Sequence, residues 1–190
     1  LSWWGMDMPP KDWARQCSDA AKTGYMSAKL KARTWYDLHA SIRAIIKVVP
    51  SQFKLDFDYN GTLANAACAV EHLKSLEQYE QVAMIESPIP QGDVAGNRHI
   101  RQRINRPIAM HYGQPPIATT MKEDVADGFV VCAGASAIRS QSAIADATNK
   151  PFWLQLVGTG ITTTWAAHLG AVSLQAKWPA ITCMNIWKEQ

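Results

Sequence analysis

Ionisable side chains recur along this 190-residue sequence at intervals of about one β/α unit. The members of the series stand 27, 28 and 25 residues apart: Lys31, Asp58, Glu86 and His111. Lys29 precedes the first of them by two residues, and residues two apart in a strand point to the same face. Because each of these residues ends a short β-rich run, we expect all five side chains to meet at one end of a parallel sheet.

Two lysines, two carboxylates and an imidazole in one place indicate metal-assisted proton abstraction. Hard cations such as Mg²⁺ prefer oxygen ligands, which Asp58 and Glu86 would supply. A metal-bound carboxylate substrate has a more acidic α-proton, because the metal stabilises the enediolate that forms. A lysine serves as the base only if its pKa falls toward neutrality, and a second ammonium nearby lowers that pKa by repulsion. Lys29 and Lys31 would form such a pair.

Each feature of this series also has an ordinary explanation. A Lys-x-Lys pair usually lies on a solvated surface, and an Asp or Glu after a strand is often a helix cap. A single histidine such as His111 is more often structural than a ligand. Only the joint pattern of these residues at barrel spacing indicates a site.

Short β-rich runs alternate with amphipathic runs along the whole chain, which predicts a parallel sheet with helical crossovers. The expected strands are 1–6, 25–31, 53–58, 82–86, 107–111, 128–132, 152–157 and 180–186. The expected helices are 11–22, 34–49, 62–79, 93–104, 119–126, 137–148 and 162–174. An eight-stranded barrel and an open doubly wound sheet both fit this order. The strand count and the polar residues at several strand ends favour the barrel.

Three motifs resemble the enolase superfamily, within it the mandelate racemase and muconate lactonizing enzyme group. They are Lys29-Leu30-Lys31, Asp58-Tyr59-Asn60 and Glu86-Ser87-Pro88. The resemblance implies an α/β fold, a modified TIM barrel of (β/α)₇β type. It also implies Asp58 and Glu86 as ligands of Mg²⁺, supported by Asn60. Lys31 would be the base, with Lys29 lowering its pKa and touching the substrate carboxylate.

The second half departs from the family pattern. His111 and Tyr112 stand where the family has its third carboxylate ligand. If His111 binds, the metal preference shifts toward Mn²⁺ or another divalent ion such as Fe²⁺ or Zn²⁺. The sixth strand offers Cys132 in place of an acid or base, and the seventh has no histidine. A second catalytic group is then missing, or comes from His111, Tyr112, Cys132 or a residue outside this chain.

The family's N-terminal α+β capping domain is not found in this sequence. We therefore interpret residues 1–190 as one barrel domain, a fragment of a longer protein. The resemblance also implies a homo-oligomer and a small carboxylate substrate, for which we expect a sugar acid. The expected reaction is that of an acid-sugar dehydratase or a racemase-like enzyme, hence a lyase or isomerase. Two alternatives are a divergent member that binds metal or a small acid without turnover, and an unrelated barrel with metal-free chemistry.

Composition narrows the possible partners. The net charge is only +3 and no basic run occurs, so we expect no nucleic acid partner. No apolar run reaches the roughly 20 residues that span a bilayer, so we expect no membrane association. The four cysteines lie far apart without a Cys-x-x-Cys pair, which argues against a zinc knuckle or a disulfide framework. That usage is typical of a reducing compartment, and we expect a cytoplasmic protein.

Overall fold

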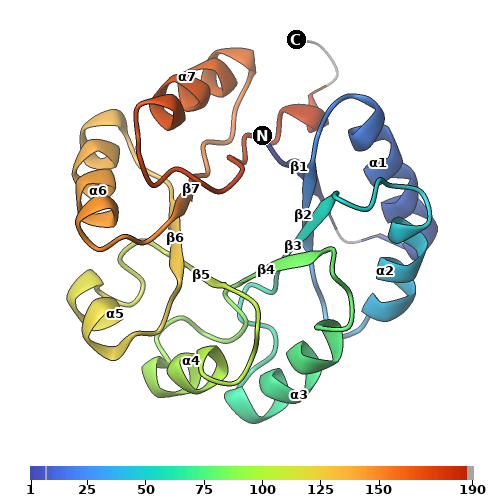
Figure 1. The fold of residues 1–190 in the computed structure, drawn as a ribbon, viewed down its shortest axis with the longest axis horizontal. Coiled ribbons are helices and arrows are strands. Elements are labelled where there is room, and N and C mark those ends of the chain that lie inside the picture. The colour runs from blue at the N-terminus through green and yellow to red at the C-terminus, as the bar shows by residue number, and fades with distance from the viewer. Residues whose placement is uncertain (7, 188–190) are drawn as a thin grey trace.

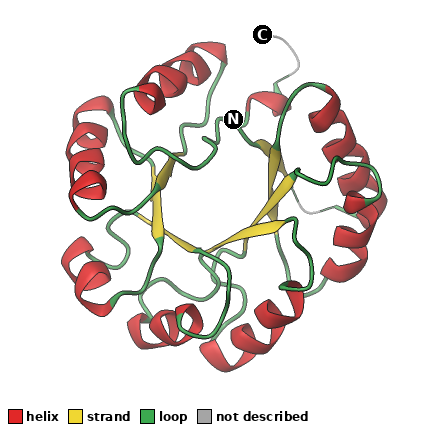
Figure 2. Ribbon diagram, in the orientation of Figure 1, coloured by secondary structure: helices red, strands yellow, loops and turns green. Residues whose placement is uncertain are grey.

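The computed structural model describes residues 1–6 and 8–187, in which seven parallel strands form one sheet. The strands follow chain order, β1-β2-β3-β4-β5-β6-β7, and curl around a central axis (Figure 1). The helices surround the strands as an outer layer (Figure 2). The architecture is α/β and TIM-barrel-like, as the alternation of runs predicts.

The strands are short. Their bounds are β1 Trp3–Gly5, β2 Ser27–Lys31, β3 Lys54–Asp58, β4 Val82–Glu86, β5 Ile108–His111, β6 Gly128–Val131 and β7 Phe152–Leu154. The helices are α1 Pro10–Lys22, α2 Leu38–Ile46, α3 Ala66–Leu76, α4 Val94–Arg101, α5 Ile117–Glu123, α6 Ala135–Ala147 and α7 Gly160–Ala171, followed by the 3₁₀ helix η1 Met184–Ile186. Each predicted helix is present, but several are shorter than predicted.

Side-chain caps explain the late start of three helices. Asp37, Asn65 and Asp93 each accept a hydrogen bond from the backbone N–H three residues later. Such caps fix the first turn of a helix, because they satisfy N–H groups that lack an intrahelical partner. Helix α2 therefore begins at Leu38 instead of residue 34, and α3 begins at Ala66 instead of residue 62.

The predicted eighth strand, 180–186, is wrong over most of its length. Within it Ile181 forms only an isolated bridge with Gln155, and Met184–Ile186 is the 3₁₀ helix. The segment still joins both edges of the sheet: the Ile181 N–H donates to Leu154 O, and the Ser2 N–H donates to Ala180 O. Cys183 then adopts a left-handed conformation, φ 55°, which turns the chain out of the extended form.

Two layers of apolar side chains hold the fold. The larger lies between strands and helices, where Leu30, Phe57 and Ile85 are almost wholly buried. A smaller cluster consists of Met84, Ala109, Val130, Trp153, Ile181 and Cys183. Trp4 and Trp178 pack against this smaller cluster.

All four cysteines are free: Cys17 and Cys183 are buried, and Cys68 and Cys132 are exposed. Among the described residues, no helix is both long and apolar enough to cross a membrane.

Candidate metal and proton-transfer site

Strand register brings the predicted residues together. Lys31 pairs with Asp58, and Asp58 pairs with Glu86, so these three lie at one level on neighbouring strands. They are also the last residues of β2, β3 and β4. Parallel strands end at the same edge of the sheet, so the sequence spacing becomes spatial proximity.

Lys29 lies between the two carboxylates. Its Nζ is 2.5 Å from Glu86 Oε2 and 3.3 Å from Asp58 Oδ2. All three side chains are nearly inaccessible, at 2%, 1% and 2% exposed for Lys29, Asp58 and Glu86. The two carboxylates thus converge on one buried position that holds a positive charge. Buried charges require such pairing, because an isolated ion in a low-dielectric interior is costly.

Lys31 lies closer to the opening of the barrel. Its Nζ donates to Asp58 Oδ2 at 2.5 Å and to Asn60 Oδ1 at 3.0 Å, and its side chain is 22% exposed. Asp58 Oδ2 is therefore shared by both lysines. Arg33 adds a third cation, since its Nη2 donates to Asn60 Oδ1 at 3.1 Å. Lys31 combines an accessible amine with a buried carboxylate partner, as a group that meets a substrate requires.

Burial and pairing act in opposite directions on these groups. Burial lowers the pKa of Lys29, but the negative charges of Glu86 and Asp58 outweigh that effect and raise it above its ordinary value. Burial raises the pKa of Asp58, but Lys29 and Lys31 outweigh it and hold that pKa below its usual range. Both groups are thereby kept charged near neutral pH. The like-charge repulsion expected between the two lysines is opposed here by the carboxylate that lies between them.

The loops after the strands hold this geometry. Asn60 has a left-handed backbone, φ 49°, which asparagine tolerates better than most residues. Its N–H donates to Asp58 Oδ1 at 3.0 Å, while its side-chain oxygen faces Lys31. The next N–H, of Gly61, donates to Ser87 O at 2.7 Å and ties the loop after β3 to the loop after β4. The Asp-x-Asn motif therefore orients both the carboxylate and the lysine.

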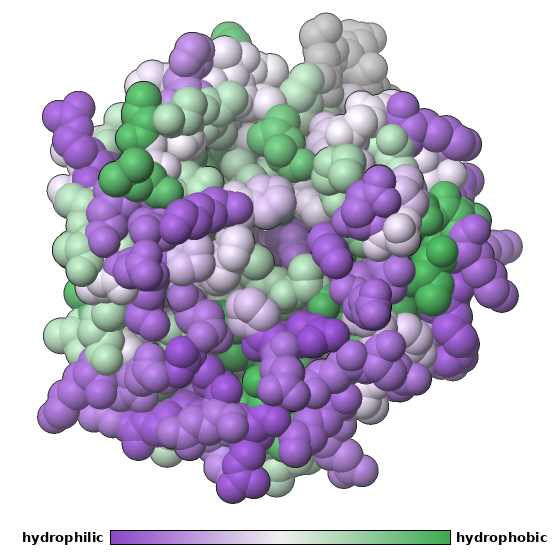
Figure 3. Space-filling model, viewed as in Figure 1, coloured by the Kyte–Doolittle hydropathy of each residue, from purple (hydrophilic) through white to green (hydrophobic). Residues whose placement is uncertain are grey.

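His111 reaches the cluster from β5. Its Nε2 lies 3.1 Å from Glu86 Oε1, and its side chain is 29% exposed. Asn60, Ser87 and His111 help to line a cavity of about 470 Å³ at this end of the strands. Figure 3 shows the opposite face of the barrel, at the starts of the strands, where the centre of the ring is hollowed.

Two predicted residues lie apart from the cluster. Tyr112 is next to His111 and faces the other way, with its ring 5.3 Å from that of Phe129 in an edge-on contact. It packs with the apolar residues between β6 and α6, and burial raises its pKa. Cys132 follows β6 and is exposed, without a described contact to the charged cluster. The alternation of side chains along β5 explains why Tyr112 and His111 diverge.

Three further residues belong to the site and are absent from the sequence prediction. Gln155, just after β7, accepts a hydrogen bond from Lys29 Nζ at 2.6 Å. The ring centroid of Trp153 lies 5.4 Å from the same nitrogen, a cation–π distance. Arg33 reaches Asn60, as described above. The polar character of Gln155 in the predicted seventh strand could have indicated it. The sequence prediction considered only a histidine at this strand and therefore missed it.

The donor set suits a divalent cation in part. Asp58 and Glu86 are buried carboxylates that converge on one cationic centre, the arrangement that hard metal ions use. Within the described part of the chain, however, no group of three or more His, Cys, Asp or Glu residues is arranged to hold a metal. Lys29 takes the position between the carboxylates, and His111 contacts only Glu86 of the pair. A metal would therefore compete with the Lys29 ammonium for the same oxygens.

The sequence matches the model of the enolase C-terminal domain-like family over residues 12–188. This chain belongs to that family. The assignment confirms the enolase-superfamily resemblance read from the three motifs and excludes an unrelated barrel. A search of curated proteins found no match to this sequence.

Solved structures of the superfamily share the fold. A dipeptide epimerase from Enterococcus faecalis V583 aligns with a TM-score of 0.84 and 19% identity, covering 96% of this chain and 56% of that one. An N-succinyl Arg/Lys racemase from Bacillus cereus aligns at 0.85 and 17% identity, covering 99% and 53%. A dipeptide epimerase from Cytophaga hutchinsonii, solved with Mg and D-Ala-L-Val, aligns at 0.80 and 19%, covering 98% and 53%. The chain spans about half the length of these structures, and at such identities the likeness establishes the fold alone.

Proposed function

We propose that this enolase-superfamily chain is the barrel domain of a metal-dependent enzyme that removes the α-proton of a carboxylate substrate. The observation that carries the proposal is the convergence of Lys31, Asp58 and Glu86 at one strand end, with Lys29 between the carboxylates. Residues 180–183 would take the place of an eighth strand, which gives a (β/α)₇β barrel.

Lys31 is the proposed base. Its ammonium is partly exposed and fixed by Asp58 and Asn60, so it can present a nitrogen to a substrate in the neighbouring cavity. Asp58 and Glu86 would hold Mg²⁺ or another divalent ion, with His111 as a further ligand after a small shift of its ring. When bound, the metal would neutralise the charge that develops on the substrate carboxylate. Its competition with Lys29 would free that ammonium to contact the substrate carboxylate.

Dehydration suits this site better than racemisation. A racemase needs a base on each face of the carbon, yet the ends of β6 and β7 present Cys132 and Gln155. A single lysine can take the α-proton and return it to a departing β-hydroxyl on the same face, releasing water. A small sugar acid, with its carboxylate and β-hydroxyl, is therefore the proposed substrate. Racemase-like activity would require Cys132 or a residue outside this chain as the second base.

We also propose a small carboxylate ligand, a divalent metal, an oligomeric state and a cellular location for this protein. The cavity of about 470 Å³ beside Asn60 and His111 is large enough for such a substrate. Bound Mg and small-molecule complexes of superfamily members support a divalent ion and a small carboxylate ligand. A homo-oligomer and a cytoplasmic location remain part of this proposal.

A second candidate function is binding without turnover. It is favoured by the contact of His111 with Glu86 and by the absence of an acid or base at the ends of β6 and β7 in the described chain. Calorimetric titration with Mg²⁺ or Mn²⁺, with and without Glu86→Gln, separates the two. Metal binding that is lost in the variant, without turnover of any acid in a broad library, would favour the second candidate.

Proton exchange tests the main proposal. The full-length protein is incubated in D₂O with Mg²⁺ and a library of sugar acids, and loss of the α-proton signal is followed by NMR. We expect Lys31→Ala to slow exchange by at least about 100-fold, the usual contribution of a general base. Lys47→Ala, which removes an exposed lysine, is the matched control. Exchange that continues unchanged in Lys31→Ala would disprove the assignment of the base.

A further inference from the structure

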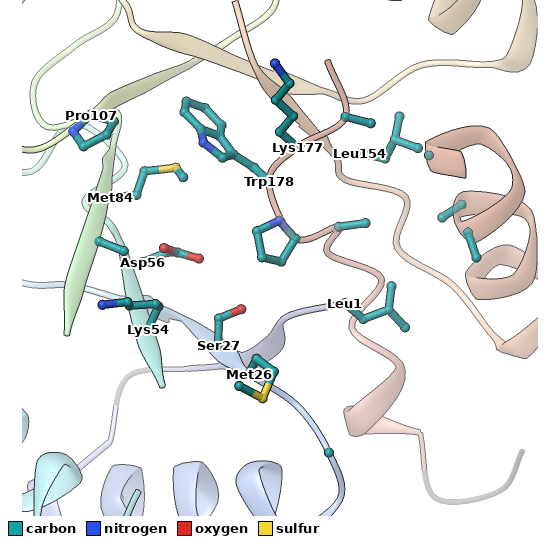
Figure 4. A pocket seen from close by; sticks show the side chains of 18 of the residues that line it. Leu1, Met26, Ser27, Lys54, Asp56, Met84, Pro107, Leu154, Lys177 and Trp178 are labelled. Carbon is teal, nitrogen blue, oxygen red and sulfur yellow. The ribbon is translucent and has the colours of Figure 1, made fainter. Parts of the chain in front are cut away.

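A second cavity, of about 670 Å³, lies at the opposite ends of the strands from the charged cluster. It is bordered by the first residues of β2 and β3, Ser27 and Lys54, and by Pro107, just before β5. Trp178 and Leu154 contribute apolar surface (Figure 4). None of the residues proposed for proton abstraction or metal binding lines this cavity.

Asp56 is the unusual member of the lining. Asp56 is only 8% exposed, yet no hydrogen bond or ion pair joins its side chain to another described residue. Ser27, which lines the same cavity, is 2% exposed, and its hydroxyl also lacks a hydrogen-bond partner among the described residues. Buried polar groups are nearly always paired, so two unpaired ones at one cavity indicate a missing partner.

The side chains in Figure 4 indicate the charge of that partner. The Asp56 carboxylate and the Ser27 hydroxyl both point toward the middle of the cavity. The ammonium groups of Lys54 and Lys177 point away from it, and Lys54 Nζ donates to Glu80 O at 3.2 Å. Among the side chains labelled in Figure 4, the only charged group turned inward is thus negative. A cation fits this arrangement, whereas an anion would meet a carboxylate.

The apolar lining of the cavity indicates the nature of the uncharged part of the ligand. Met84, Leu154 and Trp178 add apolar surface to the lining, and an aromatic ring such as that of Trp178 can attract a cation. An inorganic ion would leave these walls solvated. We propose that this second cavity, at the starts of the strands, binds a small organic ammonium compound with an apolar body, anchored by Asp56 and Ser27. The site is separate from the proton-abstraction site and does not depend on the function proposed above.

The probe is 2-phenylethylammonium, with 2-phenylethanol and 3-phenylpropionate as neutral and anionic compounds of similar shape. Binding to the full-length protein is followed at pH 8 through the indole N–H resonance of Trp178, assigned with Trp178→Phe. We expect saturable shifts with the amine and at least about tenfold weaker binding of the alcohol. Tighter binding of the propionate would show that the cavity prefers anions and would overturn the proposal.

Variants locate the binding. Asp56→Asn should weaken amine binding at least about tenfold and Ser27→Ala about threefold, whereas Glu71→Gln, on the exposed face of α3, should have no effect. Glu86→Gln tests whether the amine binds instead to the carboxylates of the charged cluster, Asp58 and Glu86. We expect this variant to retain amine binding. Equal affinity in wild type and Asp56→Asn, loss in Glu86→Gln alone, or no saturable binding would each overturn the proposal. Circular dichroism of each variant confirms that it is folded.

Discussion

Asp56 and Asp58 are two residues apart on β3, face the same side of the sheet, and are both more than nine-tenths buried. Their environments nevertheless differ. Asp58 is within 3.3 Å of the Lys29 ammonium and 2.5 Å of the Lys31 ammonium, whereas Asp56 has no ion pair with a described residue. Burial raises the pKa of Asp56 to about 7, partly opposed by Lys29, while the two lysines hold the pKa of Asp58 below its usual range.

The comparison shows that depth of burial does not determine the charge of a carboxylate in this barrel; the partner does. The end of the barrel near Asp58 is organised to keep negative charge, which is the requirement for binding a metal. The end near Asp56 compensates its charge only in part, through the more distant Lys29. Variants that remove or supply a partner should therefore act in opposite directions at the two positions.

The largest expected effect follows the removal of Lys29. In Lys29→Met, Asp58 and Glu86 lose their shared buried cation, and breaking a buried pair in this way typically costs about 3–5 kcal/mol. We expect a fall of that size in the free energy of unfolding, measured by urea denaturation in EDTA. Added Mg²⁺ should restore part of it by replacing the lost cation. Lys74→Met, at an exposed position on α3, serves as the control; an equal loss there would refute this account.

Asp56→Asn should stabilise the protein in a pH-dependent way. Because the pKa of Asp56 is about 7 in the folded state and near 3.9 when unfolded, the folded state binds more protons between those values. Its contribution to stability therefore falls as pH rises from about 4 to 7. The variant lacks this loss, so its advantage should grow from near zero at pH 4 to at most about 4 kcal/mol above pH 7.

Urea denaturation across this pH range in EDTA provides the measurement, with Glu71→Gln as the matched surface control. A constant difference between Asp56→Asn and wild type at every pH would mean that the Asp56 carboxyl ionises normally in the folded protein.

The third-largest expected effect is on Mg²⁺ affinity, which should fall on substitution at one end of the barrel and not at the other. Glu86→Gln removes one proposed ligand charge, and we expect Mg²⁺ affinity to fall at least about tenfold by calorimetry, roughly 1.4 kcal/mol. Asp56→Asn should change it less than about threefold, because Asp56 faces the other cavity. Equal losses in both variants would place the metal between the two positions and contradict the proposed separation.

The smallest effect concerns Gln155. Replacing it with leucine removes a hydrogen bond to the Lys29 ammonium, for which a loss of about 1–2 kcal/mol is typical. Because Glu86 and Asp58 still pair with Lys29, the fold should persist, and thermal denaturation should show a modest decrease. A loss as large as that of Lys29→Met would mean that Gln155, rather than the carboxylates, holds the lysine.

Sequence reasoning could locate much of the site because parallel strands convert spacing into proximity. Lys31, Asp58 and Glu86 each end a strand, and register then places them side by side. The same reasoning failed for Tyr112, which follows His111 and therefore faces the helices. The strand ends in the second half of the chain carry fewer charged residues. The uncharged Gln155 was therefore harder to recognise from the sequence than the carboxylates were.

Other features depend on contacts that spacing does not encode. The final segment, 180–186, has β-like composition, but Asn185 satisfies the Trp4 backbone with its side chain and leaves only a bridge at Ile181. The position of Lys29 between Asp58 and Glu86 depends on side-chain conformation, and the sequence gives only its face of the strand. The unpaired state of Asp56 likewise follows from packing around it.

The central claim is that Asp58 and Glu86 together form a divalent-metal site from which Lys29 is displaced. A crystal of the protein soaked with Mn²⁺ and examined by anomalous diffraction tests it most directly. The account predicts a single strong anomalous peak in contact with both carboxylates, with the Lys29 side chain moved away from its position between them. A map without a peak there, with Lys29 still 2.5 Å from Glu86, would contradict the claim.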